Sequence, residues 1–338
     1  MILVTGGTGL LGSHLLLELV RSGKKVRGLK RKSSDTGQVG KVFSYYVQNP
    51  DELLGNIEWF EGDLMDFGSV EDSLEGISEI YHAGAVVSFY PCDHTEMLKV
   101  NIRGTANLVN LALEKAISKF CYVSSVSTLG RADNMGLTDE ETYWKGAKTN
   151  SQYAISKYGA EREVWRGIEE GLNAVIVNPS VILGPGFWND NSGMFRLVWE
   201  GLKYYTQGVN GYVDVRDVVR TMTQLMDRNI SGQRFIVSAD NVSYQQLFSL
   251  IAKHFDKPAP SVNVSPILSH IAWRVETLRS FIMKTKPEVT KEMATTTSQK
   301  YFYSNEKIRK TLDFQFIPVE ESVREICRMF VQDVGKAV

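Results

Sequence analysis

The sequence predicts an α/β protein with a doubly wound parallel sheet, followed by a smaller and mostly helical region. Short apolar segments alternate with helical patterns through the first half of the chain, as they do in parallel α/β sheets. A glycine-rich turn links the first apolar segment to the first helical pattern. The length of 338 residues predicts about two domains, or one large α/β domain with an appendage, and 43% hydrophobic and 23% charged residues exclude a disordered or collagen-like chain.

The composition excludes several classes of protein. Lysine and arginine total 38 and aspartate and glutamate total 39, so the net charge of −1 leaves no overall positive field for a nucleic acid. No apolar run reaches the ~18 residues that span a bilayer, and we expect neither a membrane span nor a secretory leader. The three cysteines lack the spacing of a zinc site or a disulfide framework, so no metal is expected and a reducing, cytoplasmic setting fits.

Strands and helices alternate over the first 180 residues. The segment Met1–Thr5 is short and apolar, as a buried strand is. Leucines then recur at helical spacing from Leu11 to Leu19, and Gly23 ends that helix. The alternation continues with strands expected at Lys25–Leu29, Ile57–Glu61, Glu79–His82, Phe120–Ser124 and Asn173–Val177, and with helices around Asn101–Lys115 and over Gln152–Gly167.

After the sixth strand the regular alternation stops. Residues 185–193 are rich in glycine and asparagine and predict a loop at the edge of the sheet where ligands commonly bind. We interpret Gly211–Val215 and Arg234–Val237 as strands that return to the first domain, separated by a helix over Asp217–Asp227. The chain from Ser243 onward is mostly helical. The predicted division is a first domain over residues 1–180, with 212–240 returning to it, and a second portion over 181–338.

The turn after the first strand has the pattern of a dinucleotide site. It reads Thr5-Gly6-Gly7-Thr8-Gly9-Leu10-Leu11-Gly12. Such a turn needs glycines because it is tight and its backbone approaches a pyrophosphate closely, while the helix N-terminus faces the phosphates. An ordinary turn is the alternative, but the position between a strand and a helix favours the binding site. The residues expected to contact the dinucleotide here are Gly6, Thr8, Gly9, Leu10, Leu11 and Gly12.

The end of the second strand indicates which dinucleotide binds. A carboxylate there holds the ribose 2′-hydroxyl of NAD, whereas a basic group accommodates the 2′-phosphate of NADP. Lys30 and Arg31 stand at this position, and no acid follows before Asp35. The planar Arg31 side chain can hold a phosphate with two hydrogen bonds, and Lys30 adds a point charge. A solvated basic loop is the alternative, and we predict that residues 1–180 bind NADP(H).

Two residues one helical turn apart form a candidate catalytic pair. Tyr153 and Lys157 occupy positions i and i+4 of a predicted helix and therefore lie on one face. A nearby cation favours the phenolate and lowers the tyrosine pKa, so Tyr153 can give a proton to a carbonyl oxygen or take one back in the reverse reaction. On its own, this spacing more often marks an ordinary surface pair.

A third candidate lies at the end of a strand. The strand over Phe120–Ser124 ends in hydroxyl groups at the carboxyl edge of the sheet, where such folds bind ligands. Ser125 is expected to hydrogen-bond the substrate oxygen and to stabilise the charge that develops on it. Ser124 and Ser127 are the alternative choices, and a serine that only satisfies a turn is the simplest interpretation.

With the glycine turn and these three residues in order, the sequence resembles the extended short-chain dehydrogenase/reductases, the NAD-dependent epimerase/dehydratase group. The resemblance covers nearly the whole length and is specific for family and cofactor, but not for substrate. Gly84 departs mildly from the family's His-x-Ala-Ala pattern. The matching segments are Thr5–Gly12, Gly62–Leu64, His82–Ala85, Asn101–Asn107, Asn178–Gly186 and Ser304–Phe314.

The resemblance implies roles for residues within these segments. It places Asp63 and Leu64 near the adenine and makes Asn101 a structural and relay residue. It also makes Lys157 a ligand of the nicotinamide ribose, next to Tyr153. The other cofactor contacts that it implies are Ala83, Gly84, Ala85, Pro179, Ser180 and Val181.

Within the group, the chain is most similar to dihydroflavonol-4-reductase-like and 3β-hydroxysteroid dehydrogenase-like members, on Lys30-Arg31 and the segment Tyr212–Asp217. Sugar-nucleotide epimerases typically carry Arg-Asp just before the aromatic residue of that segment, and the arginine binds the substrate diphosphate. Asn210-Gly211 stands there instead, although Arg196 or Arg216 could substitute. The resemblance therefore favours a reductase, because a diphosphate without a positioned cation would be poorly compensated.

Aromatic side chains in predicted loops near the catalytic edge indicate an apolar or aromatic carbonyl substrate. Each of them is more often a packing residue than a ligand contact. Besides Ser125, the candidate substrate contacts are Ser88, Phe89, Trp144, Phe187 and Trp188. Four histidines, His82, His94, His254 and His270, are expected to be structural or solvated. Four acids, Asp139, Glu140, Glu141 and Asp190, are expected to face solvent.

An apolar stripe at helical spacing runs through Ile267–Ile282. Packing over the substrate cleft is its expected role, and a membrane-surface or dimer helix is the alternative. The family resemblance also implies a homodimer through the helices around Asn101–Lys115 and Gln152–Gly167.

Together these patterns predict an NADPH-dependent enzyme that reduces a ketone or aldehyde, with Tyr153 as acid. A nucleotide-sugar epimerase or dehydratase with tightly bound NAD(P), and a 3β-hydroxysteroid dehydrogenase-like enzyme, are the alternative enzymes. A non-catalytic NADP-dependent sensor is less consistent with the complete set of Ser125, Tyr153 and Lys157.

Overall fold

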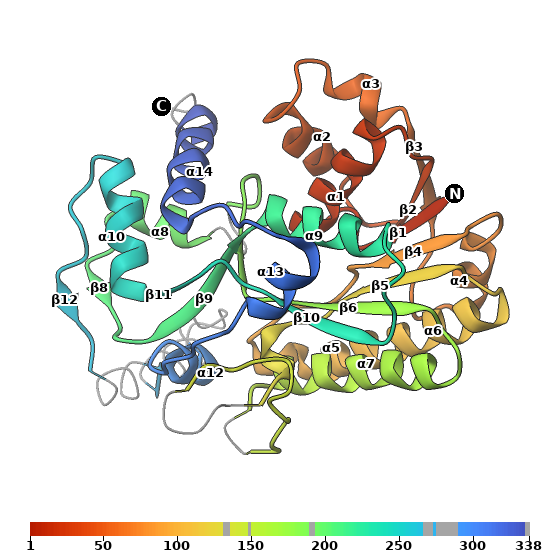
Figure 1. Ribbon diagram of the computed structural model, residues 1–338. Coiled ribbons are helices and arrows are strands. Elements are labelled where there is room, and N and C mark those ends of the chain that lie inside the picture. Colours follow the sequence, from red (N-terminus) through yellow and green to blue (C-terminus); the bar gives the residue numbers. More distant parts are fainter. Residues whose placement is uncertain (131–135, 148–149, 189–192, 266–272, 275–289, 335–338) are drawn as a thin grey trace.

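Seven strands form the central sheet of this computed structural model, which describes residues 1–130, 136–147, 150–188, 193–265, 273–274 and 290–334. The strands are β1 (Ile2–Thr5), β2 (Val26–Lys30), β3 (Ile57–Glu61), β4 (Glu79–His82), β5 (Lys119–Val123), β6 (Ala174–Pro179) and β10 (Gln233–Val237). Their spatial order is β10-β6-β5-β4-β1-β2-β3, and every neighbouring pair is parallel (Figure 1). The chain winds outward in both directions from β1, which confirms the predicted doubly wound fold.

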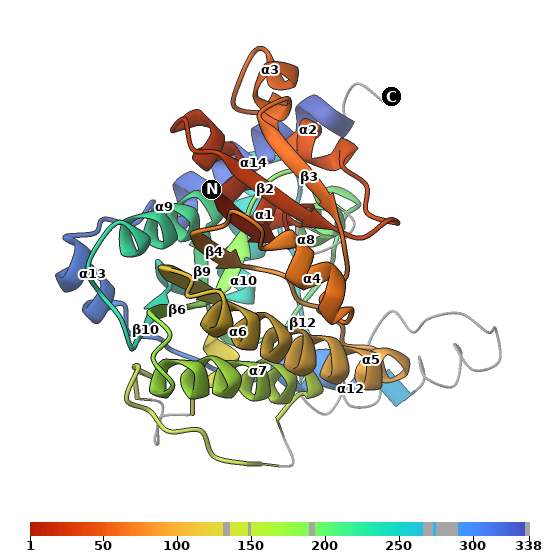
Figure 2. The same ribbon diagram turned by 90° about the vertical axis from the view of Figure 1, so that its right-hand side faces the viewer.

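Helices cover both faces of this sheet, as parallel strands require. Leu3 and Val4 are adjacent in β1 and fully buried, yet they join different apolar clusters on opposite faces. This burial on both sides explains why the strands are continuous apolar runs. The helices α1 (Leu10–Arg21), α2 (Gly37–Ser44), α3 (Pro50–Leu54) and α9 (Val215–Met226) lie on one face, and α4 (Phe67–Ser73), α5 (His94–Lys99), α6 (Thr105–Glu114) and α7 (Gln152–Glu169) on the other (Figures 1 and 2).

A smaller layer is built mainly from the second half of the chain. Its sheet has the order β11-β9-β7, with β7 (Val181–Leu183), β9 (Val209–Asp214) and β11 (Asp240–Ser243). The helices α8 (Gly193–Trp199), α10 (Tyr244–His254) and α14 (Val319–Val334) share an apolar core that contains Phe195 and Phe330. The remaining elements are β8 (Tyr204–Tyr205), β12 (Val262–Asn263), α12 (Lys291–Thr296) and α13 (Glu306–Leu312).

The predicted strands of the first half agree with the structure to within two residues at each end. The interpretation of Gly211–Val215 as a returning strand is wrong, because β9 pairs with β7 and β11 in the smaller sheet. Only β10 joins the large sheet, where it pairs with β6. Since β5 and β10 occupy the two edges of β6, no edge of that strand is left for β9.

Some of the predictions concern residues that the structure does not describe. The predicted apolar helix over Ile267–Ile282 lies outside the described residues except for Trp273 and Arg274. Asp190 and His270 also lie outside them. Among the described residues, no helix is long and apolar enough to cross a membrane. In the same part of the chain, no group of three or more histidine, cysteine or acidic side chains is arranged to hold a metal ion.

Candidate active site

The turn between β1 and α1 accepts only glycine at two of its positions. Gly6 has a φ of +71°, and a Cβ atom there would lie 2.7 Å from the Gly84 backbone nitrogen. A Cβ atom on Gly12 would lie 2.0 Å from the Gly6 carbonyl oxygen. A Cβ atom on Gly9 would meet only that same oxygen, at 3.4 Å, which is an ordinary contact. The fold itself therefore explains Gly6 and Gly12 but not Gly9.

The first turn of α1 is suited to an anion. Gly9 precedes the helix without a capping side chain, and no acid lies in the first turn. The backbone N–H groups at this end have no partner within the helix and carry a partial positive charge. Leu10 and Leu11 are buried beneath the turn, and Thr8 is half-buried beside it. These residues fit the pyrophosphate of a dinucleotide.

The basic end of β2 lies beside the end of β3. Gly62 donates its backbone N–H to the Lys30 carbonyl oxygen at 2.9 Å, and Arg31 follows as an exposed residue. Asp63 comes next on the β3 side, with its Oδ1 accepting from the Met65 backbone N–H at 2.9 Å. The Leu64 side chain lies against Gly84 and Gly104. The strand register therefore brings Lys30, Arg31, Asp63 and Leu64 to one edge of the sheet.

The segment Ala83–Ala85 crosses the glycine turn and is fixed on both sides. The Gly84 backbone N–H donates to Thr5 Oγ1 at 3.1 Å. Beyond it, the Asn101 amide donates to the Val86 carbonyl oxygen at 2.9 Å and accepts from the Val86 N–H at 2.7 Å. Asn101 lies in a π-helical turn and also donates to Ser156 Oγ on α7 at 3.0 Å. Asn101 is thus a structural clamp between the cofactor edge and the catalytic helix.

The three predicted catalytic residues meet at the carboxyl edge of β5. Ser125 follows the strand directly, and its Oγ accepts from the Ser127 backbone N–H at 3.1 Å. Tyr153 lies in the first turn of α7, which is capped by the Ser151 hydroxyl. The Tyr153 phenol is hydrogen-bonded to the Ser125 side chain. Lys157 follows one turn later on the same helix, so the structure brings the three residues together at one edge of the sheet, and their catalytic roles stay predictions.

Lys157 is a buried cation that contacts two residues of β5. Its Nζ donates to Tyr122 Oη at 2.9 Å and to the Val123 carbonyl oxygen at 2.8 Å, and lies 4.5 Å from the centre of the Tyr122 ring. Burial lowers the pKa of Lys157 to about 7, and the Glu161 carboxylate opposes this shift. Lys157 therefore changes charge near neutral pH, as residues of active sites often do.

The predicted effect of Lys157 on Tyr153 is wrong for this structure. Burial raises the pKa of Tyr153, and the hydrogen bond with Ser125 is what opposes that rise. The reason is the direction of the ammonium group, which points to Tyr122 and Val123. Helical spacing fixes the shared face of two residues but not the direction of a flexible lysine head group.

Two residues of the site escaped the sequence analysis. Tyr122 anchors Lys157 from β5, but in the sequence it is only one more apolar strand residue, so no signal could have found it. Glu161 is 2% exposed and bonded to the Ser124 hydroxyl and to Arg234. It follows Lys157 by four residues, as Lys157 follows Tyr153, and this second step of four was the available signal.

The segment after β6 carries an unpaired polar group. Pro179 ends the strand, Val181 begins β7, and Ser180 between them is 7% exposed. The Ser180 hydroxyl has no hydrogen-bond partner among the described residues. Buried hydroxyls without a partner are uncommon in folded proteins, so this group fits a contact with a ligand.

Of the predicted substrate contacts, Phe89 lies beside Tyr153. The ring centres of Phe89 and Tyr153 are 6.0 Å apart. Ser88 has a structural role instead, because its hydroxyl donates to Asp93 Oδ2 at 2.7 Å and accepts from the Tyr90 backbone N–H at 3.2 Å. These two bonds fold the loop that presents Phe89.

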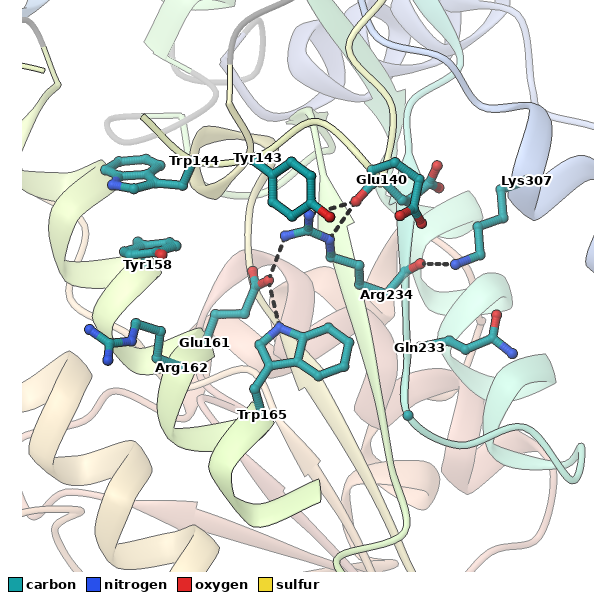
Figure 3. Close-up of a pocket in the computed structure, with 12 residues that line it drawn as sticks. Glu140, Tyr143, Trp144, Tyr158, Glu161, Arg162, Trp165, Gln233, Arg234 and Lys307 are labelled. Carbon is teal, nitrogen blue, oxygen red and sulfur yellow. Dashed lines mark hydrogen bonds and ion pairs between the residues drawn. The ribbon is translucent and has the colours of Figure 1, made fainter. Parts of the chain in front are cut away.

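Trp144 lines a different cavity, on the outer side of α7. The cavity has a volume of about 440 Å³, and Figure 3 shows the Trp144 and Tyr158 rings stacked at one end of it. Their ring centres are 4.5 Å apart and their planes differ by 10°. Tyr158 is the neighbour of Lys157 in sequence, but successive residues of a helix point about 100° apart. The structure therefore does not bring Trp144 to the catalytic edge.

Two further aromatic candidates are core residues. Trp188 is 8% exposed, and its Nε1 donates to Asp333 Oδ2 at 2.8 Å while its ring packs on Phe330. Phe187 packs against the apolar cluster of the central sheet. The prediction that both contact substrate is not supported, because the loop that carries them folds back onto the protein.

The expectation that Glu140 faces solvent is also wrong. Glu140 is 6% exposed, and its Oε1 accepts from the Ile236 backbone N–H at 2.8 Å. Among the histidines, His82 is structural as predicted, since its ring nitrogens bond to Thr5 Oγ1 at 2.6 Å and to Thr105 Oγ1 at 3.0 Å.

With this geometry in place, comparisons with known proteins identify the family. The model of the NAD dependent epimerase/dehydratase family matches residues 2–238. The chain belongs to this family. Its relatives and fold make it an NAD(P)-dependent enzyme of the oxidoreductase type.

The curated relatives include enzymes named as reductases. A putative dihydroflavonol 4-reductase from Synechocystis sp. is 27% identical over 97% of this chain and 93% of its own length. Cinnamoyl-CoA reductase 1 from Petunia hybrida is 22% identical over 96% of this chain and 90% of its own length. Sterol demethylase protein B from Methylococcus capsulatus is 29% identical over 79% of this chain and 78% of its own length.

Solved structures show the same fold. The crystal structure of gox2253 has a TM-score of 0.81 and 28% identity, and covers 98% of both chains. UDP-glucose 4-epimerase from Thermotoga maritima has a TM-score of 0.77 at 19% identity, over 98% of this chain and 99% of its own. At that identity, the likeness concerns the fold alone.

Proposed function

We propose that this chain is an NADPH-dependent oxidoreductase that reduces a ketone or aldehyde on an apolar or aromatic small molecule. The observation that carries the proposal is the convergence of Ser125, Tyr153 and Lys157 at the end of β5. Ser125 follows this strand, Lys157 Nζ donates to the Val123 carbonyl oxygen at its end, and Tyr153 lies one helical turn before Lys157. The curated relatives that span nearly the whole chain, a putative dihydroflavonol 4-reductase and a cinnamoyl-CoA reductase, support the same class of reaction.

Each of the three residues has a role in this proposal. A reduced nicotinamide supplies a hydride when it is bound. Tyr153 donates its phenolic proton to the carbonyl oxygen, and Ser125 donates a hydrogen bond that stabilises the charge on that oxygen. The Ser125 Oγ accepts from the Ser127 backbone N–H and hydroxyl, so the Ser125 proton points away from Ser127 and can be donated to a carbonyl oxygen beside Tyr153. Lys157 holds the nicotinamide ribose, and its ammonium group is positioned at the end of β5 by Tyr122 and the Val123 carbonyl oxygen.

The choice of NADP(H) over NAD(H) rests on Lys30 and Arg31. Both lie at the carboxyl edge of the sheet, where the adenosine ribose of a dinucleotide is held in such folds. Replacing them together, as Lys30→Asp and Arg31→Ser, should reduce the preference for NADPH over NADH by about tenfold or more, because the 2′-phosphate loses its cations. The control is Lys32→Ser, the next basic residue of the run, which should leave the preference unchanged. If the ratio of the kcat/KM values for the two cofactors were unchanged in the double variant, Lys30 and Arg31 would not be the residues that select NADP(H).

A nucleotide-sugar epimerase or dehydratase is less consistent with the residues near β9. Asn210 and Gly211 stand where an arginine would bind the substrate diphosphate, and Asn210 Oδ1 accepts from the Gly211 backbone N–H at 2.9 Å. Arg216 is already paired with Asp214 at 2.8 Å and with Glu325 at 2.6 Å. Of the candidate cations, only Arg196 is left, so a diphosphate would be poorly neutralised.

A panel of substrates tests the proposed reaction directly. Purified protein is given NADPH with a dihydroflavonol, a cinnamoyl thioester, a 3-ketosteroid or UDP-glucose, and absorbance at the reduced-cofactor band is followed. Net oxidation of NADPH with an apolar carbonyl compound, and none with UDP-glucose, is the expected result. Conversion of UDP-glucose without net change of cofactor would contradict the proposal, and oxidation with the steroid alone would select the 3β-hydroxysteroid dehydrogenase-like alternative.

We also propose that residues 1–180 hold the cofactor and that residues 181–338 supply much of the substrate pocket. A homodimer through α6 and α7 is proposed on the family resemblance alone, and analytical ultracentrifugation tests it by the measured mass.

A further inference from the structure

Glu161 is the buried carboxylate behind the catalytic edge. It lies on α7 one turn after Lys157 and two turns after Tyr153, and it is 2% exposed. Both of its oxygens are hydrogen-bonded, and they face opposite directions. A buried carboxylate is costly unless its partners satisfy it, so the identity of those partners indicates what the residue does.

The inner oxygen of Glu161 faces the turn that contains Ser125. Its Oε2 accepts from the Ser124 hydroxyl and lies 2.7 Å from Thr128 Oγ1. The Asn178 amide has two protons and lies 2.9 Å from that oxygen and 3.1 Å from the Ser125 carbonyl oxygen, so it can donate to both. Thr128 Oγ1 is also 2.8 Å from the Ser125 carbonyl oxygen. The groups bonded to Glu161 therefore hold the chain on both sides of Ser125.

The outer oxygen of Glu161 faces the cavity beside α7. Its Oε1 accepts from Trp165 Nε1 at 3.2 Å and from Arg234 Nη1 at 3.2 Å. Figure 3 shows Arg234 and Trp165 converging on this carboxylate from two sides. Arg234 in turn donates to the Glu140 carbonyl oxygen through Nε at 2.9 Å. The charge of Glu161 is thus balanced on the outer side, which leaves the inner oxygen for the turn.

We propose that Glu161 is a positioning residue of the active site, which fixes the Ser124–Thr128 turn and thereby directs the Ser125 hydroxyl toward the Tyr153 phenol. Lys157 holds the same strand end through the Val123 carbonyl oxygen, so α7 holds the end of β5 at two successive turns. The effect on rate rests on the proposed function, whereas the effect on the turn does not. Neighbouring groups bonded in one network are expected to act together rather than additively.

A double-mutant cycle tests whether Glu161 acts through Ser125. In an assay below pH 6, which favours protonated Lys157 in every variant, Glu161→Gln should lower kcat by about 10- to 100-fold, because a small misplacement of a catalytic group costs that much. In the Ser125→Ala background, the same change should lower kcat by less than about threefold. An equal loss in both backgrounds would overturn the proposal, because it would show a general structural effect.

A second variant covers the case in which Glu161→Gln does not fold. Thr128→Val is close in shape and keeps the charge of Glu161 paired with Arg234, but removes the hydroxyl between Glu161 and the Ser125 carbonyl oxygen. It should lower kcat in the wild-type background and have little effect in the Ser125→Ala background. The matched control is Trp165→Phe, which removes a donor to the outer oxygen only and should leave kcat unchanged.

Hydrogen exchange tests the effect on the turn without any turnover. The Thr128 backbone N–H donates to the Ser125 carbonyl oxygen at 3.1 Å, so its exchange reports on the order of this turn. Exchange of peptides covering residues 124–129 should be at least about fivefold faster in Glu161→Gln than in the wild type, and unchanged in Trp165→Phe. If these peptides exchanged at the same rate in Glu161→Gln as in the wild type, the inference would be overturned. Faster exchange in a protein that reduces no carbonyl would keep it and reject the proposed function instead.

Discussion

Burial sets the protonation of two basic side chains below the candidate site. It lowers the pKa of Lys157 to about 7 and that of His82 to about 3. The pKa of Lys157 is therefore close to neutral pH, and the Glu161 carboxylate raises it and so helps to keep Lys157 charged. His82 stays neutral under all physiological conditions, which suits its bonds to the hydroxyls of Thr5 and Thr105.

The neutral His82 makes the fold sensitive to acid. Its pKa is 6.5 in the unfolded chain and about 3 in the folded one, so the unfolded chain binds more protons between these values and stability falls as the pH falls through them. Between pH 6.5 and pH 5, the wild type should lose on the order of 2 kcal/mol more unfolding free energy than His82→Gln, which cannot titrate. Urea unfolding at both pH values measures this difference. The same pH dependence in both proteins would show that His82 is not the titrating group.

At the scale of elements, the glycine turn separates what the fold needs from what a ligand needs. Gly12→Ala places a Cβ atom 2.0 Å from the Gly6 carbonyl oxygen, whereas Gly9→Ala meets that oxygen only at 3.4 Å. The open space beside Gly9 is where the backbone can approach a pyrophosphate. The two substitutions should therefore differ in their effect on the stability of the fold.

Gly12→Ala should lower the melting temperature by several degrees, while Gly9→Ala should change it little. Both should raise the Kd for NADPH by about tenfold or more, because in one the turn is distorted and in the other a methyl group occupies the space for the phosphates. Differential scanning fluorimetry and isothermal titration calorimetry measure the two quantities. If Gly9→Ala bound NADPH as tightly as the wild type, the turn would not be the pyrophosphate site.

The elements of the first half were predictable because the inner strands of the parallel sheet are buried on both faces. Strands such as Ile2–Thr5 are therefore short apolar runs between turns. The same signal does not say which sheet a strand joins, so Gly211–Val215 was assigned to the wrong one. The partners of a strand depend on which edges are already occupied, and that is a property of the whole sheet.

At the scale of the whole molecule, one carboxylate connects three regions that are far apart in sequence. Asp333 near the end of α14 accepts hydrogen bonds from the Tyr45 hydroxyl and from Trp188 Nε1, the latter at 2.8 Å, and pairs with Lys41 at 3.1 Å. Tyr45 and Lys41 belong to the region of α2, and Trp188 follows β7. Burial together with Asp333 raises the pKa of Tyr45 above its usual value, so the phenol remains a donor.

Asp333→Ala should lower the free energy of unfolding by about 1–3 kcal/mol, because the Trp188 N–H and the Tyr45 hydroxyl lose their acceptor. The control is Lys253→Ala, which breaks a pair with Glu320 whose two side chains are 66% and 60% exposed. That control should change stability by less than about 0.5 kcal/mol. Urea unfolding compares the two, and equal effects would contradict the role given to Asp333.

The convergence of Ser125, Tyr153 and Lys157 was predictable because strand ends and helical spacing are local properties. The surroundings of that set were not. Trp144 and Trp188 were selected as aromatic residues in loops, but only the folded chain shows that one faces the outer side of α7 and the other the core. Glu161 was overlooked because an acid on a long helix is usually solvated, and its burial depends on partners up to 73 residues away in sequence.

The most direct test of the account is the activity of Tyr153→Phe with a carbonyl substrate found in the panel. We predict that kcat falls by about 100-fold or more, since the proton donor is lost, while the Kd for NADPH changes by less than about threefold. Tyr158→Phe, on the same helix but facing the outer cavity, should keep the wild-type kcat. An unchanged kcat in Tyr153→Phe would contradict the account.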